Sequence, residues 1–165
     1  METLHLSLVW RRSIIKSRIY FAGPLFTQAE RLWNHRLADT ILKKNSALEI
    51  FLPQEEAKKA ISENGIDFKK IKDICLKGID SCDRVVAILD GADSDSGTCF
   101  ECGYSYAMGK KIIGVRTDIR SGEDQGLNAM LNQSCSSVIH YSAEKDSEMD
   151  LEFLAEKIIE KLKML

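Results

Sequence analysis

The chain has 165 residues, of which 44% are hydrophobic and 29% are charged, and its formal net charge is −2. This composition is typical of a globular domain with a sizeable core, and it gives no electrostatic reason to expect a nucleic acid polymer or an acidic membrane as a partner. No apolar run approaches the roughly 20 residues that a membrane span needs.

The N-terminal part of the chain divides into an extension and the start of a domain. Residues 1–16 show no clear periodicity, so we treat them as an extension to a domain that spans residues 17–165. The apolar run RIYFA at 18–22 predicts the first strand. A capping-box pattern at Thr27 and Glu30 then predicts a helix that ends near Asn45.

The next elements alternate between strand and helix. A strand is predicted at 48–52, followed by a polar stretch at 54–65 that we interpret as a loop with a short helix. A helix is predicted over 67–81. Four side chains at helical spacing are expected to turn inward from it, namely Phe68, Ile71, Cys75 and Ile79.

A strand, an acidic turn and a helix form the middle of the chain. The β-branched run at 85–89 predicts a strand buried on both faces, and a helix follows from Thr98 to Gly109. The remaining predicted elements are a strand at 112–115, a loop at 116–125, a short helix at 126–131, a strand at 137–140 and an amphipathic helix at 148–165.

Because strands alternate with helices through most of the chain, we predict one doubly wound α/β domain with a parallel sheet. Five strands in so short a chain favour the flavodoxin-like order 2-1-3-4-5. Ligands bind such sheets at the carboxyl ends of the strands. Asp90, Asp95 and Glu101 follow the third strand and are therefore expected at that edge.

The residues alone leave the chemistry of this edge open. Three carboxylates fit a divalent cation, or carboxylate catalysis of glycosyl transfer, in which one carboxylate attacks the anomeric carbon. The same residues also fit solvated turn formers and an exposed helix residue. Arg116 and Arg120 follow the fourth strand, where they could either bind a phosphate or brace the loop.

The five cysteines are an odd number, scattered over predicted helices and loops, which favours reduced thiols in the cytoplasm over a disulfide framework. Cys99 and Cys102 form a C-x-x-C pair. A zinc site needs a second pair of ligands, and the sequence offers none, so we interpret these two cysteines as small core residues and expect no metal.

Several motifs resemble those of the nucleoside 2-deoxyribosyltransferases, over roughly residues 18–140. They are the segment YFAGPLF at 20–26, the LDG at 89–91, the DSGT at 95–98 with Glu101, the GY at 103–104 and the GLNAM at 126–130. The Asp-x-Gly-x-x-x-Glu element formed by Asp95, Gly97 and Glu101 is the most specific of them.

The resemblance implies roles for these residues. Glu101 looks like the family's nucleophile, which forms a covalent glycosyl-enzyme, and Asp95 like the acidic residue that binds the sugar hydroxyls. Asn128 resembles an asparagine that reaches into a neighbouring subunit, so a homo-oligomer is implied. The other residues expected to bind substrate are Tyr20, Gly23, Phe26, Asp90, Gly91, Gly97 and Met130.

One position departs from the family pattern. The family usually has an aspartate near the base, at the position where this chain has Cys75. Asp73 is close, but residues two apart do not share a helix face. A neutral thiol is a poor general acid, so either another residue replaces the aspartate or the choice of base and the rate differ.

We therefore expect an enzyme of nucleotide salvage that moves a (2-deoxy)ribosyl group between nucleobases and needs no cofactor. Its partners would be a nucleoside or nucleotide and a free base. The first alternative is a nucleoside 5′-monophosphate N-glycosidase, with Arg116 and Arg120 on the phosphate. The second is a non-catalytic nucleotide-binding module, which would not need a carboxylate at Glu101.

Overall fold

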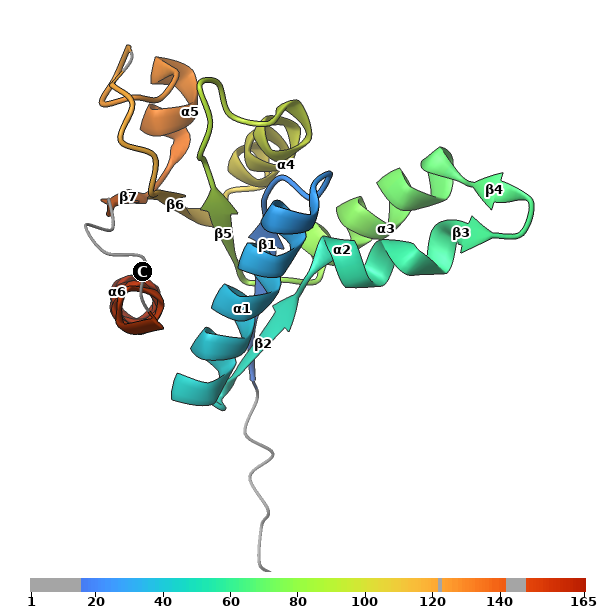
Figure 1. Cartoon of the computed structure of the whole chain (residues 1–165), viewed down its shortest axis with the longest axis horizontal. Helices are drawn as coiled ribbons and strands as arrows, with labels where there is room; N and C mark the ends of the chain where they lie inside the picture. Colours follow the sequence, from blue (N-terminus) through green and yellow to red (C-terminus); the bar gives the residue numbers. More distant parts are fainter. Residues whose placement is uncertain (1–15, 122, 142–147) are drawn as a thin grey trace, which may run out of the picture.

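A computed structural model describes residues 16–121, 123–141 and 148–165 of the protein. Its centre is a five-stranded parallel sheet in the order β2-β1-β5-β6-β7 (Figure 1). With the strands of this sheet renumbered in chain order, this is the predicted order 2-1-3-4-5. The strands are β1 (Ser17–Ala22), β2 (Leu48–Phe51), β5 (Arg84–Ile88), β6 (Lys111–Arg116) and β7 (Ser137–His140).

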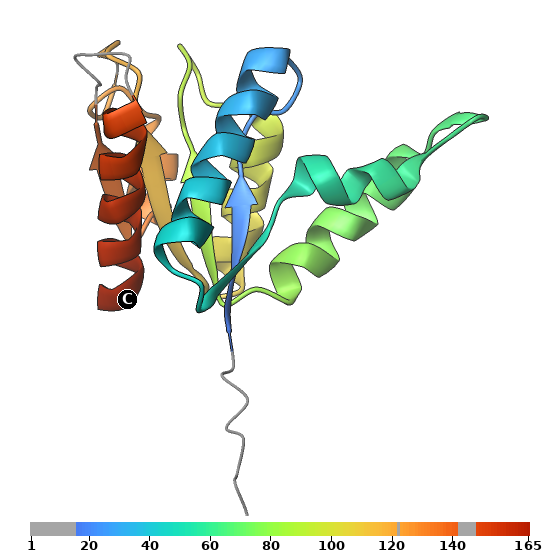
Figure 2. The same ribbon diagram turned by 60° about the horizontal axis from the view of Figure 1, so that its bottom comes forward.

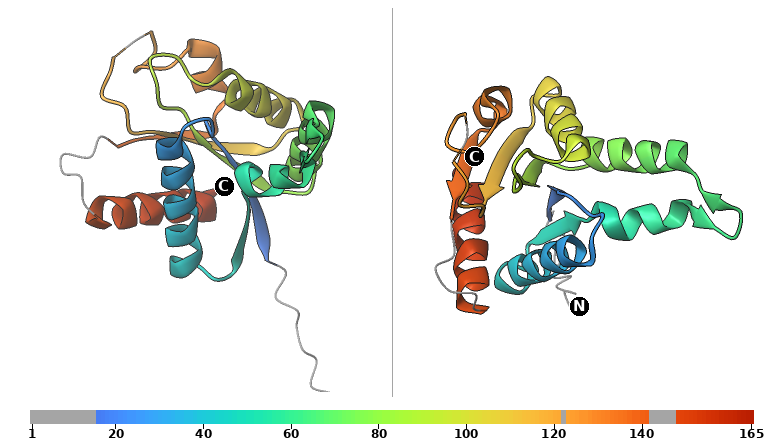
Figure 3. Two further views of the ribbon diagram at one scale, coloured as in Figure 1. Left: turned by 45° about the vertical axis from the view of Figure 1, so that its right-hand side comes forward. Right: turned by 45° about the horizontal axis from the view of Figure 1, so that its top comes forward.

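Helices cover both faces of the sheet, as expected for a doubly wound fold. One layer holds α1 and α6, and the other holds α3, α4 and α5 (Figures 1 and 3). The helices are α1 (Gln28–Lys44), α2 (Pro53–Glu56), the 3-10 helix η1 (Ala57–Ala60), α3 (Phe68–Asp80), α4 (Ser96–Ala107), α5 (Ala129–Ser134) and α6 (Glu148–Met164). The Thr27–Glu30 capping box at the start of α1 is present.

Each central strand feeds two cores because successive side chains point to opposite faces. Ile19 and Phe21 of β1 are buried in the core with α1 and α6, whereas Tyr20 and Ala22 are buried in the core with α3 and α4. Burying a side chain of this size contributes about 1.5–3 kcal/mol, so the alternation is strongly fixed. It aims Tyr20 at the α3/α4 layer.

The polar stretch after β2 is more structured than predicted. It contains α2, η1 and a small antiparallel hairpin of β3 (Ile61–Ser62) and β4 (Gly65–Ile66). Together with the first turns of α3, the hairpin forms an arm that projects away from the sheet (Figure 2). The prediction that Phe68 turns inward is therefore wrong: it lies on this arm and is 75% exposed.

Two other expectations concern the ends of elements. The extension at 1–16 lies outside the described residues apart from Lys16, and the first strand begins at Ser17. The short helix predicted at 126–131 is found at Ala129–Ser134 instead, because Gly126 adopts a left-handed turn (φ 88°) and Asn128 caps the helix. No helix in the described ranges is long and apolar enough to cross a bilayer.

Candidate active site

Glu101 lies in the second turn of α4, and its side chain contacts β1 on the α3/α4 side of the sheet. The Tyr20 hydroxyl donates a hydrogen bond of 2.5 Å to Glu101 Oε1. Tyr20 is fully buried, and its ring stacks on Phe51 with the centroids 5.3 Å apart. The Glu101 carboxylate is therefore half-buried and held by a rigid aromatic side chain, and it forms no ion pair with another described residue.

Burial raises the pKa of Glu101 from its ordinary 4.5 to about 7, and the negative charge of Asp95 adds to this rise. The hydrogen bonds from Tyr20 and Cys75 oppose it by lowering the pKa. Burial and the neighbouring carboxylate also raise the pKa of Tyr20, so that it remains a hydrogen-bond donor. A carboxylate titrating near neutrality in such surroundings is typical of a reactive group.

Asp95 caps α4 and so places a second carboxylate next to Glu101. Its Oδ2 accepts hydrogen bonds from the Thr98 amide (2.8 Å) and hydroxyl (3.0 Å). At Gly97 an added Cβ would lie 3.2 Å from the same oxygen. The glycine two residues after Asp95 thus leaves space for the Asp95 carboxylate at the start of the helix.

Cys75 contributes the third neighbour of Glu101, from α3. Its thiol interacts with both Tyr20 and Glu101, and burial raises the pKa of this thiol. Asp73 pairs with Lys72 at 2.9 Å, and both side chains are substantially exposed. As expected from its place on the helix, Asp73 does not replace an acid at position 75. We refer below to Tyr20, Cys75, Asp95 and Glu101 as the Glu101 site.

A family model described as nucleoside 2-deoxyribosyltransferase matches residues 19–131, which include all four residues of the Glu101 site. The chain belongs to this family. It is therefore an enzyme of the N-glycosidic bond, and the non-catalytic alternative is set aside.

Solved structures of family members and other proteins share the fold. A conserved protein from Enterococcus faecalis V583 has 28% sequence identity and a TM-score of 0.72, with 88% of this chain and 99% of that chain covered. A 2-deoxyribosyltransferase from Bacillus psychrosaccharolyticus has 23% identity and a TM-score of 0.59, covering 82% and 90%. The CMP N-glycosidase BcmB from Clostridium botulinum has 18% identity and a TM-score of 0.55, covering 87% and 99%. A search of curated proteins found no match.

Asp90 lies apart from the Glu101 site. It follows the alternation of β5 to the opposite face, where Oδ1 accepts from the amides of Thr117 (2.5 Å) and Asp118 (3.0 Å) and Oδ2 from the Thr117 hydroxyl (2.6 Å). The next residue, Gly91, has φ 116°, and a Cβ there would lie 2.7 Å from the carbonyl oxygen of Asp93. Asp90 therefore clamps β5 to β6, and Gly91 provides the turn towards α4.

The two arginines after β6 brace loops. The Arg116 guanidinium is 3% exposed and donates to the carbonyls of Leu89 (2.7 Å), Gly91 (3.3 Å) and Arg120 (3.1 Å). Arg120 forms an ion pair with Asp118, which in turn accepts a bond from the Gly91 amide. Of the two roles left open by the sequence, bracing is the one that these bonds support.

Asn128 and Met130 lie away from the Glu101 site. They line a hollow of about 570 Å³ between α4 and α5. Asn128 Oδ1 caps α5 by accepting from the Met130 amide at 3.0 Å, and Met130 is 78% exposed. Neither Glu101 nor Tyr20 borders this hollow. Within one chain, then, these two residues are not brought to Glu101.

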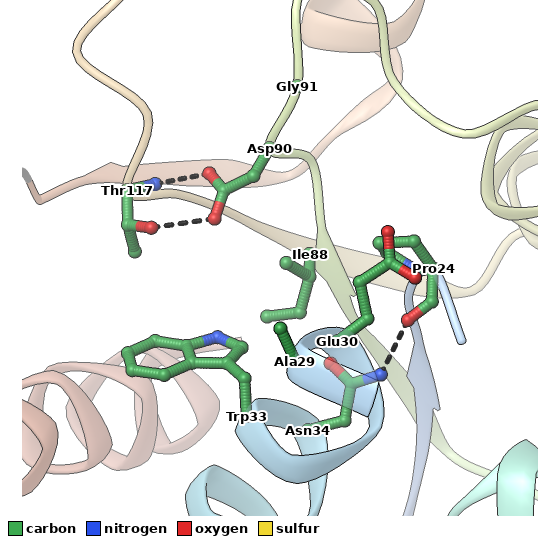
Figure 4. Close-up of a pocket in the computed structure, with 9 residues that line it drawn as sticks. All are labelled: Pro24, Ala29, Glu30, Trp33, Asn34, Ile88, Asp90, Gly91 and Thr117. Carbon is green, nitrogen blue, oxygen red and sulfur yellow. Dashed lines mark hydrogen bonds between the residues drawn. The ribbon is translucent and has the colours of Figure 1, made fainter. Parts of the chain in front are cut away.

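A second hollow, of about 320 Å³, opens on the α1 face of the sheet edge (Figure 4). Pro24, Trp33, Asn34, Asp90 and Thr117 are among its lining residues. The Trp33 indole N–H and the Asn34 amide oxygen are buried there without a hydrogen-bond partner among the described residues. This polar lining was missed from the sequence, where Trp33 reads as a core residue.

The two remaining predicted substrate residues belong to the loop between β1 and α1. Gly23 packs closely, since an added Cβ would lie 3.3 Å from the Cβ of Ile88 and 3.4 Å from the amide oxygen of Asn34. Phe26 is 72% exposed. In the described parts of the chain, no group of three or more His, Cys, Asp and Glu side chains is arranged to hold a metal ion.

Proposed function

We propose that the protein transfers a (2-deoxy)ribosyl group between nucleobases through a covalent intermediate on Glu101. An Oε atom of Glu101 attacks the sugar C1′, the C1′–N bond breaks, and its electron pair leaves with the base. An acceptor base then attacks C1′ from the vacated side and restores the carboxylate. Two displacements retain the configuration at C1′.

The observation that carries this proposal is the hydrogen bond from Tyr20 to Glu101 in the presence of Asp95. Tyr20 orients the carboxylate, and a half-buried position keeps it poorly solvated, which makes it a better nucleophile than an exposed one. In this proposal Asp95 accepts hydrogen bonds from the sugar hydroxyls through Oδ1, since Thr98 donates only to Oδ2.

The substrate is proposed to be a nucleoside rather than a nucleotide. Arg116 is buried and bonded to three carbonyl groups, and Arg120 is paired with Asp118, so both arginines named for a 5′-phosphate are otherwise engaged. We further propose a homo-oligomer in which Asn128 serves a neighbouring site. A role in cytoplasmic nucleotide salvage agrees with five cysteines that are all free.

Base exchange tests the function directly. The protein is incubated with a nucleoside and a second free base, in deoxyribo, ribo and 5′-phosphorylated forms, and the products are separated by chromatography. We expect a new nucleoside from the wild type and a loss of at least about 1,000-fold in Glu101→Gln. Free sugar without exchange would indicate hydrolysis, and equal rates in wild type and Glu101→Gln would refute the role of Glu101.

The covalent intermediate has its own test. A fluorine at C2′ slows glycosyl transfer because it destabilises the oxocarbenium-like transition state. With a 2′-fluoro-arabinosyl nucleoside, mass spectrometry should find the added sugar on the peptide that contains Glu101. An adduct on another residue, or none while turnover proceeds, would contradict the mechanism.

A further inference from the structure

The groups that face Glu101 are acidic or neutral on every element packed around it. They are the hydroxyl of Tyr20 from β1, the thiol of Cys75 from α3 and the carboxylate of Asp95 at the start of α4. Among the described residues, no lysine, arginine or histidine contributes to the electrostatic surroundings of Glu101. The Glu101 site therefore favours a positive charge on its ligand.

Within the described parts of the chain, the Glu101 site also lacks a proton donor placed for a departing base. The Tyr20 proton is already donated to Glu101, the nucleophile itself. The thiol of Cys75 is a weak acid whose pKa is raised further by burial and by Glu101. Asp95 uses one carboxylate oxygen as the acceptor of two bonds from Thr98 and so acts there as an N-cap acceptor. A neutral base that must be protonated as it leaves would find no acid among the described residues of this chain.

We propose that the Glu101 site acts on N-glycosides whose base already carries a positive charge, such as N7-alkylpurine, N3-alkylcytosine and N-ribosylpyridinium compounds. This inference rests on the glycosyl-Glu101 chemistry proposed above. Cys75 is then the residue that determines specificity, since it occupies the α3 position next to Glu101 with a group that neither protonates the base nor repels a cation.

The chemical step balances without a proton. Glu101 Oε forms a bond to C1′, the C1′–N bond breaks, and its electron pair neutralises the positive charge of the base nitrogen. A cation and a carboxylate thus become a neutral ester and a neutral base. Attack of a free base or of water on C1′ releases Glu101 as the carboxylate, and any surplus proton passes to solvent.

The physical advantage is twofold. General acid catalysis contributes roughly 100- to 10,000-fold when a donor is present, and a cationic leaving group does not need that contribution. A bound cation next to Glu101 also favours the ionised carboxylate, which is the form that attacks. A neutral nucleoside gains neither benefit.

Matched substrate pairs test the inference. Guanosine is compared with 7-methylguanosine, and cytidine with 3-methylcytidine, each in ribo and deoxyribo forms. Release of the base is followed chromatographically, and each rate is divided by the uncatalysed rate in the same buffer, because alkylation weakens the bond by itself. For the wild type we expect the rate enhancement to be at least about 100-fold larger for the cationic member of a pair.

Two variants of the same size test whether an acid at position 75 changes the preference for a cationic base. Cys75→Asp introduces a carboxyl group beside Glu101 and should raise the enhancement on the neutral member at least tenfold, so that the ratio between the members falls. Cys75→Asn has the same shape without an acid and should leave the ratio high. Thermal melting of both variants checks their fold, and the wild-type ratio stands as a test even if one variant is unstable.

The outcomes separate the two proposals. Equal enhancements for neutral and cationic members, or a fall in the ratio in Cys75→Asn as large as in Cys75→Asp, would overturn the inference while leaving Glu101 as the nucleophile. If no member of either pair is cleaved faster by the wild type than by Glu101→Gln, the proposed function fails as well.

Discussion

Charged side chains on the two sides of the sheet edge differ in their hydrogen-bond partners. On the α1 side and in the β6 loop, Asp90 accepts three hydrogen bonds and Arg116 is bonded to three different carbonyl groups. On the α3/α4 side, Glu101 has Tyr20 and Cys75 as donors and Asp95 as a like-charged neighbour.

This difference separates structural from reactive charges in this protein. Asp90 and Arg116 bond mainly to backbone groups of the loops, which holds the loops in place and leaves these charges little capacity for a ligand. A half-buried carboxylate with an incomplete set of partners costs stability, and the cost persists only where the group has another use. Four substitutions test this contrast.

The largest expected effect is the opposed response of activity and stability in Glu101→Gln. The rise of the Glu101 pKa from 4.5 to about 7 corresponds to roughly 3 kcal/mol of folding free energy. This contribution is fully present below pH 4.5, where both states are protonated, and is lost as the pH rises through 7.

Glu101→Gln should therefore be inactive yet more stable than the wild type at pH 8, by roughly 2–4 kcal/mol, with a much smaller gain at pH 4.5. Denaturant unfolding at the two pH values measures this difference. A variant that is destabilised at pH 8 would show that Glu101 is as well satisfied as Asp90, and the contrast would fail.

Arg116→Met should produce the next largest effect, and on stability rather than chemistry. It removes the bonds to the carbonyls of Leu89, Gly91 and Arg120, at a cost of about 1–3 kcal/mol for each buried acceptor left unsatisfied. Urea unfolding measures the loss. The activity per folded molecule should stay within a few-fold of the wild type, and a loss comparable to that of Glu101→Gln would place Arg116 in the reaction.

Tyr20→Phe removes the hydrogen bond that orients Glu101 and lowers its pKa. We expect kcat/KM to fall about tenfold. Because Glu101 attacks only when ionised, the acid limb of the pH–rate profile should also move to a higher pH than in the wild type. In the wild type the rate should rise through about pH 7. An unshifted acid limb in Tyr20→Phe would mean that another group controls the profile.

The smallest effect is expected for Arg120→Ala, because the Arg120 side chain is largely exposed and Asp118 keeps the hydrogen bonds from the amides of Gly91 and residue 120. Its melting temperature should change little, and KM for a nucleoside and for its 5′-phosphate should remain in the same ratio. A selective rise of KM for the phosphorylated substrate would restore the phosphate role that the sequence left open.

The strand order and the capping box at Thr27 were predicted from the sequence and are confirmed, and the sequence also singled out Glu101 and Asp95 as candidate site residues. These features depend on local signals: apolar runs of strand length, a cap three residues before a glutamate, and a motif with fixed spacing on one helix. Such signals can be recognised in a single sequence because they involve residues that lie close together in the chain.

The face of the sheet that each side chain occupies became clear only from the packing. Alternation beyond the end of β5 turns Asp90 to the α1 side, away from Glu101, and alternation in β1 directs Tyr20 towards Glu101 and Ile19 into the other core. The arm that exposes Phe68 and the bonds that occupy Arg116 were equally hidden, because both depend on partners distant in sequence. Residue types fixed what chemistry was available, and packing fixed which of those groups were left free to perform it.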